Sequence, residues 1–280
     1  MKTTLNIIVG ILLVLNITLA TESEDYLNYR IPSGAKKVGP YDTRDTGGQE
    51  YLYFAPGVEA SRENIIAIEL IQHGVLVKRK LLKNDKKHGI QREWHLNGKP
   101  KLEAPYQDGN MEGRFKVWNA NGDLIGQYTM LKGTGVVTVY DEQGRLVRED
   151  HYKDNLRDGL RMERVGKKIS LTWSKEDHLI GVGYDFYDNG ELATILFFSN
   201  RGEPNGPMME FSSKGALTKM SWYLNGREVQ EAEYAAAVVA DSSLPTYHAD
   251  GNQYKQMVGE NVRVLLEKYR TMQRVQIPLR

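Results

Sequence analysis

Three carboxylates stand at the same place in a repeated sequence pattern, and paired carboxylates are a common device for acid–base chemistry. Glu93, Asp185 and Glu210 each follow a glycine by four residues. Two such groups held close together could act as general acid and base, as in glycoside hydrolysis. Equivalent positions of a repeat more often form a solvated stripe, so we expect these residues to carry no catalysis.

The histidines and glycines add no further catalytic pattern. No two histidines have the close helical spacing of a metalloprotease, and the chain has no cysteine, so no zinc site is predicted. His88 and His95 would meet only if adjacent strands brought them together. No Gly-x-Ser-x-Gly motif occurs, and no glycine-rich loop leads into a helix as a phosphate site requires. The sequence therefore predicts no enzyme, no metal and no cofactor.

Aromatic residues mark a second repeated position, five residues after the same glycine. These ring positions are Trp94, Trp118, Tyr140, Phe186 and Phe211. A row of rings could stack against a ligand, which makes these five residues the candidate binding residues. The alternative, which we favour, is that the rings pack against their neighbours and set the register of a sheet.

A glycine, a ring and a second glycine recur at intervals of 22 to 25 residues. A period in the twenties indicates one supersecondary unit that is copied and stacked. One copy, which begins at Gly159, has Arg164 at its ring position, and we interpret it as tolerated drift. The other copies are Gly89–Trp94–Gly98, Gly113–Trp118–Gly122, Gly135–Tyr140–Gly144, Gly181–Phe186–Gly190 and Gly206–Phe211–Gly215.

Each copy is interpreted as a β-hairpin. Side chains alternate in character on both sides of the second glycine, which is typical of short strands. Several of these glycines follow asparagine, and Asn-Gly between strands predicts a two-residue type I′ turn with both residues at positive φ. We therefore predict a mainly β fold, an elongated single antiparallel sheet of stacked hairpins with C-terminal helices as a cap. The structural turn glycines are Gly98, Gly122, Gly144, Gly190 and Gly215.

The pattern Gly-x4-aromatic-x2-Asn-Gly-x-Leu-x5-aromatic-x2-Gly resembles the bacterial variant of the MORN repeat, and most closely the YwqK-type antitoxins of toxin–antitoxin systems. Gly181, Phe186, Gly190, Leu192 and Phe198 carry it in one copy. The resemblance covers about residues 75–226. It implies a hairpin array that scaffolds proteins and, in some members, binds lipid. The antitoxin label implies a toxin as partner.

Two other repeat families share single copies with this chain. The segment 139–146 is similar to one YD repeat of polymorphic toxin shells. The segment 222–226 is similar to wall-binding repeats that hold choline between aromatic residues. Neither pattern extends over the array.

The chain divides into four predicted segments. Residues 1–20 are typical of a secretory signal, because Lys2 precedes an uncharged apolar run and Ala20 stands before the expected cleavage at Thr21. This predicts export to the periplasm or the exterior, and the alternative is an uncleaved membrane anchor. Residues 21–68 form a loop-rich lead-in with short strands near 50–54 and 65–71, and residues 69–226 form the repeat array of about six repeats.

The last segment, residues 227–280, is expected to be helical. Residues 228–240 are rich in Ala and Glu, and from Tyr254 onward apolar residues recur at three- and four-residue steps. The second helix is expected to cap the last hairpins, and the alternative is that it binds a partner or a membrane.

A net charge of +1 gives no general attraction to nucleic acid. The first hypothesis is therefore an exported, non-enzymatic protein-binding or scaffold protein, with a toxin or an envelope protein as partner. The alternative is a repeat protein that binds envelope glycan or lipid through the ring positions.

Overall fold

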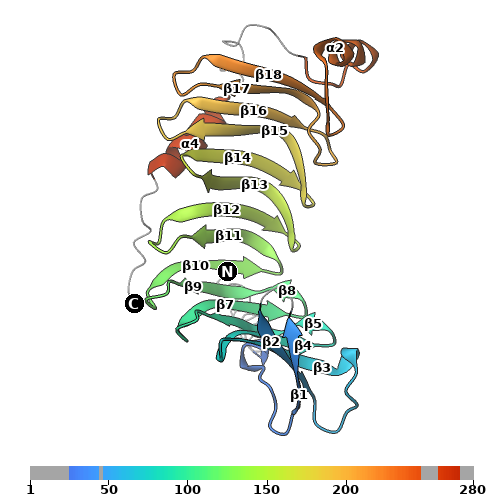
Figure 1. Cartoon of the computed structure of the whole chain (residues 1–280), viewed down its shortest axis with the longest axis vertical. Helices are drawn as coiled ribbons and strands as arrows, with labels where there is room; N and C mark the ends of the chain where they lie inside the picture. The colour runs from blue at the N-terminus through green and yellow to red at the C-terminus, as the bar shows by residue number, and fades with distance from the viewer. Residues whose placement is uncertain (1–24, 44–46, 247–257, 272–280) are drawn as a thin grey trace, which may run out of the picture. The chain divides into compact units, whose positions relative to one another are not determined.

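The computed structural model describes residues 25–43, 47–246 and 258–271 (Figure 1). The predicted signal segment, residues 1–20, lies outside them. The chain divides into two compact units, residues 1–123 and 124–280. Both units are built of antiparallel hairpins, and the two helices of the second unit follow its strands, so the predicted fold class is confirmed.

The first unit is an antiparallel sheet in which most strands pair with the strand that follows them along the chain. A short 3₁₀ helix, η1 (Asp25–Asn28), precedes the sheet, and η2 (Arg62–Asn64) leads into β3. The strands are β1 (Lys36–Thr43), β2 (Gly48–Phe54), β3 (Ile65–Gln72), β4 (Val75–Lys83), β5 (Lys86–Lys87), β6 (Gly89–Trp94), β7 (Pro100–Gln107), β8 (Asn110–Met111) and β9 (Gly113–Trp118).

The lead-in contains more sheet than the sequence predicted. The expected strands near 50–54 and 65–71 form parts of β2 and β3, but β1 was not predicted. Gly39 and Pro40 weaken the strand pattern of β1, and they lie where its register against β2 shifts, between Val38 and Tyr41. A bulge of this kind accommodates a proline, which cannot donate to the ladder.

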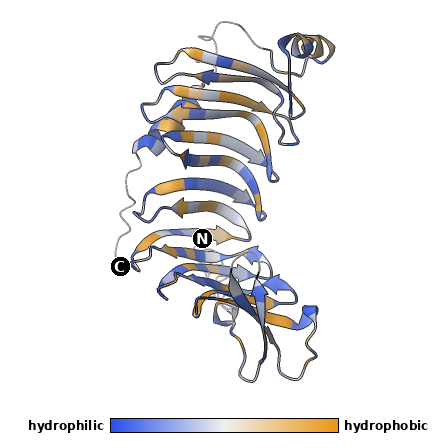
Figure 2. Ribbon diagram, viewed as in Figure 1, coloured by the Kyte–Doolittle hydropathy of each residue, from blue (hydrophilic) through white to orange (hydrophobic). Residues whose placement is uncertain are grey.

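The second unit continues the same construction, and each of its strands pairs with the next. The strands are β10 (Leu124–Leu131), β11 (Thr134–Tyr140), β12 (Leu146–Lys153), β13 (Leu156–Val165), β14 (Lys168–Lys175), β15 (His178–Tyr187), β16 (Leu192–Phe198), β17 (Gly206–Phe211), β18 (Leu217–Leu224) and β19 (Arg227–Val229). Apolar and polar residues alternate along several of these strands in Figure 2, which gives the sheet one face that can be buried.

Two helices complete the second unit. Helix α2 (Glu231–Ala240) begins later than predicted, because Arg227–Val229 pairs with β18 as strand β19. Its Tyr234 is fully buried, and the Tyr234 hydroxyl donates to the carbonyl of Pro245 at 2.6 Å. Helix α4 (Glu260–Thr271) covers part of the predicted amphipathic segment, whereas Tyr254 lies outside the described residues.

Helix α4 packs its apolar side against the sheet of the second unit, as expected of a cap, but the core cluster that it joins extends beyond the last hairpins, from β12 to β17. Leu266 and Tyr269 of α4, with Val258 just before the helix, join a core cluster with side chains of the sheet. Each such side chain stabilises the folded protein by roughly 1.5–3 kcal/mol when fully buried. The helix is therefore an integral part of this unit. The sheet residues of the cluster are Leu146, Leu160, Met162, Ile169, Leu171, Tyr184, Phe186, Leu192, Ile195, Phe197, Met209 and Phe211.

The turn glycines have the predicted backbone conformation but not the predicted turn type. Gly98, Gly122, Gly144, Gly190 and Gly215 all have positive φ, between 76° and 86°. The residues before them do not, so these are not two-residue type I′ turns. In each case the glycine N–H donates to the residue three before it, and that residue donates to the residue after the glycine. This is a type I turn followed by a left-handed glycine bulge, and we call these five-residue loops bulged turns.

The type I′ turns lie instead at the other ends of the strands. Two consecutive residues have positive φ at each of these tight turns, several of which lack the Asn-Gly sequence. Lys132-Gly133 and Glu176-Asp177 are examples. Within the residues that the structure describes, these turns lie at 73–74, 84–85, 108–109, 132–133, 154–155, 176–177 and 225–226.

Several successive turns are tied together by hydrogen bonds. In the bulged turns the donors are side chains: Asn97 donates to the carbonyl of Ala120 at 2.7 Å, and Asn189 donates to that of Ser213 at 2.9 Å. In the tight turns the donors are backbone N–H groups, as in Asn155 to Gly133 at 3.0 Å. Asn97 and Asn189 therefore make contact between repeats and also accept from the N–H two residues on, within their own turns. A type I turn does not require positive φ at their position.

Candidate functional site

The residues with catalytic potential are not brought together. Glu93 belongs to the first unit, where its carboxylate pairs with the Lys78 ammonium at 2.6 Å. Asp185 and Glu210 lie in one row of the second unit, but Thr194 pairs with both and lies between them. Two strand spacings amount to about 10 Å, which separates these carboxylates.

The histidines are engaged individually. His88 and His95 lie at opposite ends of β6: the Nδ1 atom of His88 is 3.0 Å from the Asp108 carboxylate, and the His95 ring donates to the Trp118 carbonyl at 3.0 Å. Among the described residues no group of three or more His, Asp and Glu side chains could hold a metal ion.

In the second unit, helix α4 encloses the ring positions. Phe186 and Phe211 are each 2% exposed and belong to the core cluster beneath the helix. Tyr140 is half-buried and packs against the same cluster. A ligand cannot stack on Phe186 or Phe211 while α4 is in place.

The contacts that hold α4 on the sheet include a buried polar group. The carboxylate of Glu149, on β12, accepts a hydrogen bond from the Tyr269 hydroxyl at 2.6 Å and from His151 at 3.2 Å. Lys268 lies 3.5 Å away. Burial alone would raise the pKa of Glu149, but these hydrogen bonds and the lysine charge lower that pKa to about 2. Burial and the Glu149 carboxylate raise the pKa of Tyr269.

The irregular repeat has a structural role at the same helix. Arg164, which replaces the ring, donates to the carbonyl of Leu146 at 3.2 Å and to the carbonyl of Tyr269 in the last turn of α4. Carbonyl groups in the last turn of a helix lack intrahelical partners, and a cation there is favourable. Our interpretation of this copy as drift is therefore incomplete, since the arginine binds the helix.

The ring positions of the first unit are less enclosed. Trp94 and Trp118 are both half-buried. The Arg79 guanidinium lies 5.7 Å from the centre of the Trp94 ring, within the range of a cation–π contact. The Trp118 carbonyl accepts the hydrogen bond from His95. These two rings, with Tyr140 of the second unit, are the candidate binding residues that keep accessible surface.

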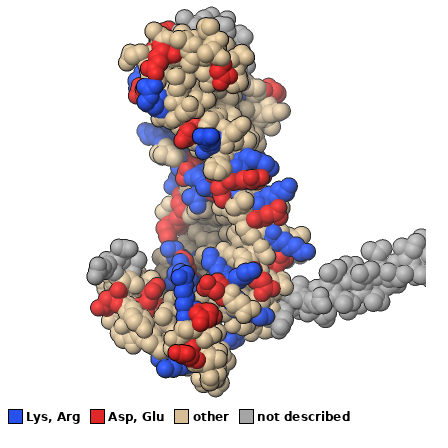
Figure 3. Space-filling model, turned by 90° about the vertical axis from the view of Figure 1, so that its right-hand side faces the viewer, with Lys and Arg blue, Asp and Glu red and all other residues tan. Residues whose placement is uncertain are grey.

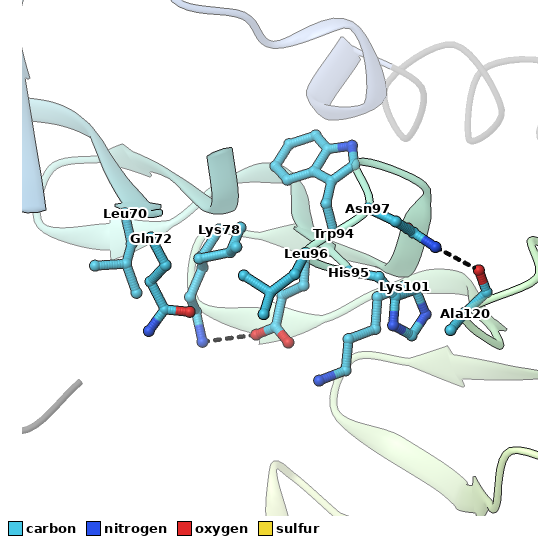
Figure 4. A pocket seen from close by; sticks show the side chains of 11 residues that line it. Leu70, Gln72, Lys78, Trp94, His95, Leu96, Asn97, Lys101 and Ala120 are labelled. Carbon is cyan, nitrogen blue, oxygen red and sulfur yellow. Dashed lines mark hydrogen bonds and ion pairs between the residues drawn. The ribbon is translucent and has the colours of Figure 1, made fainter. Parts of the chain in front are cut away.

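A hollow of about 570 Å³ lies beside Trp94 in the first unit (Figure 4). The Lys78–Glu93 ion pair lies within it, while the indole of Trp94 points away from that pair. Alternation along β6 places Glu93 and Trp94 on opposite faces of the sheet, so the hollow opens on the face that does not carry the ring. It is lined by Leu70, Gln72, Val77, Lys78, Glu93, Trp94, His95, Leu96, Asn97, Lys101 and Ala120.

The hollow was not predicted, although the sequence carried one signal for it. Residues 75–118 contain eleven Lys and Arg against five Asp and Glu, whereas the whole chain is almost neutral. Lys78 and Lys101 belong to this basic region. Lys78 and Lys101 line one hollow with Leu96 because of strand pairing and turn geometry. The composition of the region does not reveal either.

Some charges elsewhere on the surface are paired. Figure 3 shows basic and acidic side chains beside one another on one face of the molecule. In the second unit Arg157 and Asp177 lie 3.0 Å apart, and Lys175 and Asp158 lie 2.7 Å apart. Over the described ranges of the chain, no helix is long and apolar enough to cross a membrane.

Two segments of the chain match the model of the MORN repeat variant family, residues 87–108 and 134–154. The first covers the hairpin of β6 and β7, and the second covers the hairpin of β11 and β12. Repeats of this kind are generally modules that bind proteins or lipids. No curated protein matches the chain.

Proposed function

We propose that this protein is an exported repeat protein without enzymatic activity that binds another protein as a scaffold or inhibitor. The observation that carries the proposal is the hairpin at residues 87–108, which matches a protein- and lipid-binding repeat and borders an open hollow. The engagement of Glu93 by Lys78 and the separation of Asp185 from Glu210 also favour binding over catalysis.

Lipid or envelope glycan is the alternative ligand. Trp94, Trp118 and Tyr140 keep accessible surface that could contact such a ligand. Phe186 and Phe211 offer none while α4 covers them. The continuous row of rings that the alternative needs is thus reduced to three residues.

A capture experiment with the tagged protein in its native host tests the proposal. A protein partner should be recovered reproducibly and should form a complex when both components are purified and mixed. Repeated capture without any protein that binds in the purified system contradicts the proposal. Sedimentation with vesicles or cell-wall fragments, reduced by Trp118→Ala, would favour the alternative instead. Hydrolase activity that Glu93→Gln abolishes would contradict both.

The proposed partner class includes a toxin, as the antitoxin resemblance implies. A toxin-like gene beside the coding sequence, whose product binds the purified protein and loses its toxicity, would identify the protein as an antitoxin. A partner from the envelope would place it among scaffold proteins.

Export is tested by the mass of the protein isolated from fractionated cells. Cleavage after Ala20 should give a chain that begins at Thr21 in the periplasm or the medium. An intact chain in the membrane fraction would instead support an uncleaved anchor.

A further inference from the structure

The hollow of the first unit carries more positive charge than its own carboxylate can neutralise. Lys78 pairs with Glu93 at 2.6 Å. Lys101 is exposed, and in the described part of the chain it has no ion-pair partner. Basic residues outnumber acidic ones by eleven to five over residues 75–118. The hollow therefore favours a ligand with negative charge.

Apolar surface lies next to this charge. Leu96 is 56% exposed at the tip of its bulged turn. Covering this apolar surface would stabilise a complex with a partner. Leu70 lines the other side of the hollow and is half-buried. Leu96 lines the hollow together with Glu93 and Lys78 (Figure 4). A suitable ligand thus combines acidic and apolar groups at close spacing.

The rim of the hollow is fixed by hydrogen bonds before any ligand binds. The Asn97 amide donates to the Ala120 carbonyl at 2.7 Å, and the Lys99 ammonium donates to the Asn121 carbonyl at 2.7 Å. The His95 ring donates to the Trp118 carbonyl at 3.0 Å. These bonds hold the turn that presents Leu96, and preorganisation of this kind lowers the cost of binding.

We propose that the hollow binds an acidic segment of a partner protein, with an aliphatic side chain of that segment against Leu96 and Leu70 and carboxylates on Lys101 and Lys78. This inference rests on the proposed protein-binding function and names the chemistry that the partner must offer. Glu93 helps to select the segment, because its charge repels a carboxylate that is out of register.

A peptide fits the hollow better than an anionic membrane does. A recess of about 570 Å³ admits individual side chains, whereas a membrane surface meets exposed residues that project from the protein. The carboxylate of Glu93 lies inside the recess, where a dense layer of phosphates would be repelled. Only one exposed leucine stands at the rim, which is little apolar area for insertion into lipid.

The test measures binding of a fluorescein-labelled peptide in which glutamates flank a leucine. Fluorescence anisotropy with the full protein should show saturable binding that weakens with added salt. The Lys101→Glu variant should weaken binding by about tenfold or more, because it replaces attraction by repulsion at the contact. Leu96→Ser should weaken it at unchanged salt dependence. Absence of saturable binding to the wild-type protein overturns the inference.

Matched variants separate the hollow from general charge attraction. Lys83 is an exposed lysine of the same unit that does not line the hollow, so Lys83→Glu should leave the Kd nearly unchanged. Leu131, 64% exposed in the second unit, supplies the control Leu131→Ser. Equal losses for Lys83→Glu and Lys101→Glu overturn the inference, as does a peptide with lysines in place of the glutamates that binds equally well.

Two further outcomes keep this inference distinct from the proposed function. A captured partner whose complex survives both Lys101→Glu and Leu96→Ser overturns the inference while the protein-binding function stands. Vesicles of anionic phospholipid that bind with the same dependence on Lys101 and Leu96, in competition with the peptide, overturn the inference in favour of a lipid headgroup. Retained thermal stability of each variant shows that a loss of binding does not come from unfolding.

Discussion

Trp94 and Phe186 occupy the same position of the repeat, but their surroundings differ. Phe186 is 2% exposed beneath helix α4, whereas Trp94 is half-buried with the Arg79 guanidinium 5.7 Å from its ring centre. The repeat thus determines the strand and its turn, but it does not determine what covers the face. That depends on segments outside the repeat, which in the second unit supply α4.

The difference assigns different roles to equivalent residues. In the second unit the ring face is a hydrophobic core closed by Val258, Leu266 and Tyr269. In the first unit the hollow opens on the face opposite to the Trp94 ring. A ligand in the hollow of the first unit would therefore meet charged, polar and aliphatic side chains instead of a row of rings.

The largest expected effect separates the two ring positions directly. Phe186→Ala should lower the free energy of unfolding by about 3–5 kcal/mol, since it leaves a cavity in a closed core. Trp94→Ala should cost about 1–2 kcal/mol, because less of its surface is removed from water. Urea denaturation of the purified protein, followed by circular dichroism, measures both. Equal losses of stability would mean that the two rings are equally enclosed, which would contradict the difference between the two units.

A smaller effect is expected from the hydroxyl that ties α4 to the sheet. Tyr269→Phe should cost about 1.5–3 kcal/mol, because the hydrogen bond it removes goes to a charged carboxylate. The matched variant is Tyr187→Phe, which removes a 2.8 Å bond from a hydroxyl to the neutral Phe211 carbonyl and should cost about 0.5–1.5 kcal/mol. Hydrogen exchange of residues 260–271 should accelerate only in Tyr269→Phe. Faster exchange in both variants would show that α4 does not depend on this bond.

The same contact predicts a dependence on pH. The pKa of Glu149 is lowered to about 2 in the folded protein from 4.5. Its contribution to stability is therefore fully present above about pH 4.5 and is lost as the pH falls toward 2. The difference in melting temperature between wild type and Glu149→Gln should shrink over this window, since glutamine does not titrate there. A difference that stays constant down to pH 2 would mean that the carboxylate is not stabilised by its neighbours.

The sequence predicted those features that depend on local patterns. Alternation gave the strands, and the recurring glycine gave positive φ at positions such as Gly98 and Gly190. The turn type was wrong at these positions, because both turn types place glycine at positive φ and only the residue before it distinguishes them. Strand β1 was missed because Gly39 and Pro40 interrupt its pattern.

The candidate site depended on contacts that local patterns do not contain. The place of α4 on the sheet follows from Glu149, Arg164 and Tyr269, which are distant in sequence. The hollow follows from the pairing of β4 with β6, which brings Lys78 opposite Glu93. Charge density marked the region, but the position of Leu96 beside it required the geometry of the turn.

The smallest expected effect tests what the asparagines before the turn glycines do. Asn97 and Asn189 each donate to the next bulged turn, at 2.7 Å and 2.9 Å. Each side chain also accepts a hydrogen bond from the N–H two residues on, Lys99 or Glu191, at 3.0 Å. Asn97→Ala and Asn189→Ala should each cost about 0.5–1.5 kcal/mol, since both bonds that each variant removes are exposed to water. Asn121 precedes Gly122 in the same way, but its exposed side chain makes no hydrogen bond in the part of the chain that the structure describes. Asn121→Ala should therefore be nearly neutral.

The three asparagines distinguish the two explanations of the Asn-Gly pair. If the pair formed a type I′ turn, alanine would be strained at positive φ at all three positions, and the three losses would be similar. If the asparagines make contact between repeats, only Asn97→Ala and Asn189→Ala should lower the free energy of unfolding. The two losses should then be equal, although the residues belong to different units. Urea denaturation of the three variants decides between these results. A loss for Asn121→Ala as large as the other two would restore the type I′ turn and remove the role in stacking.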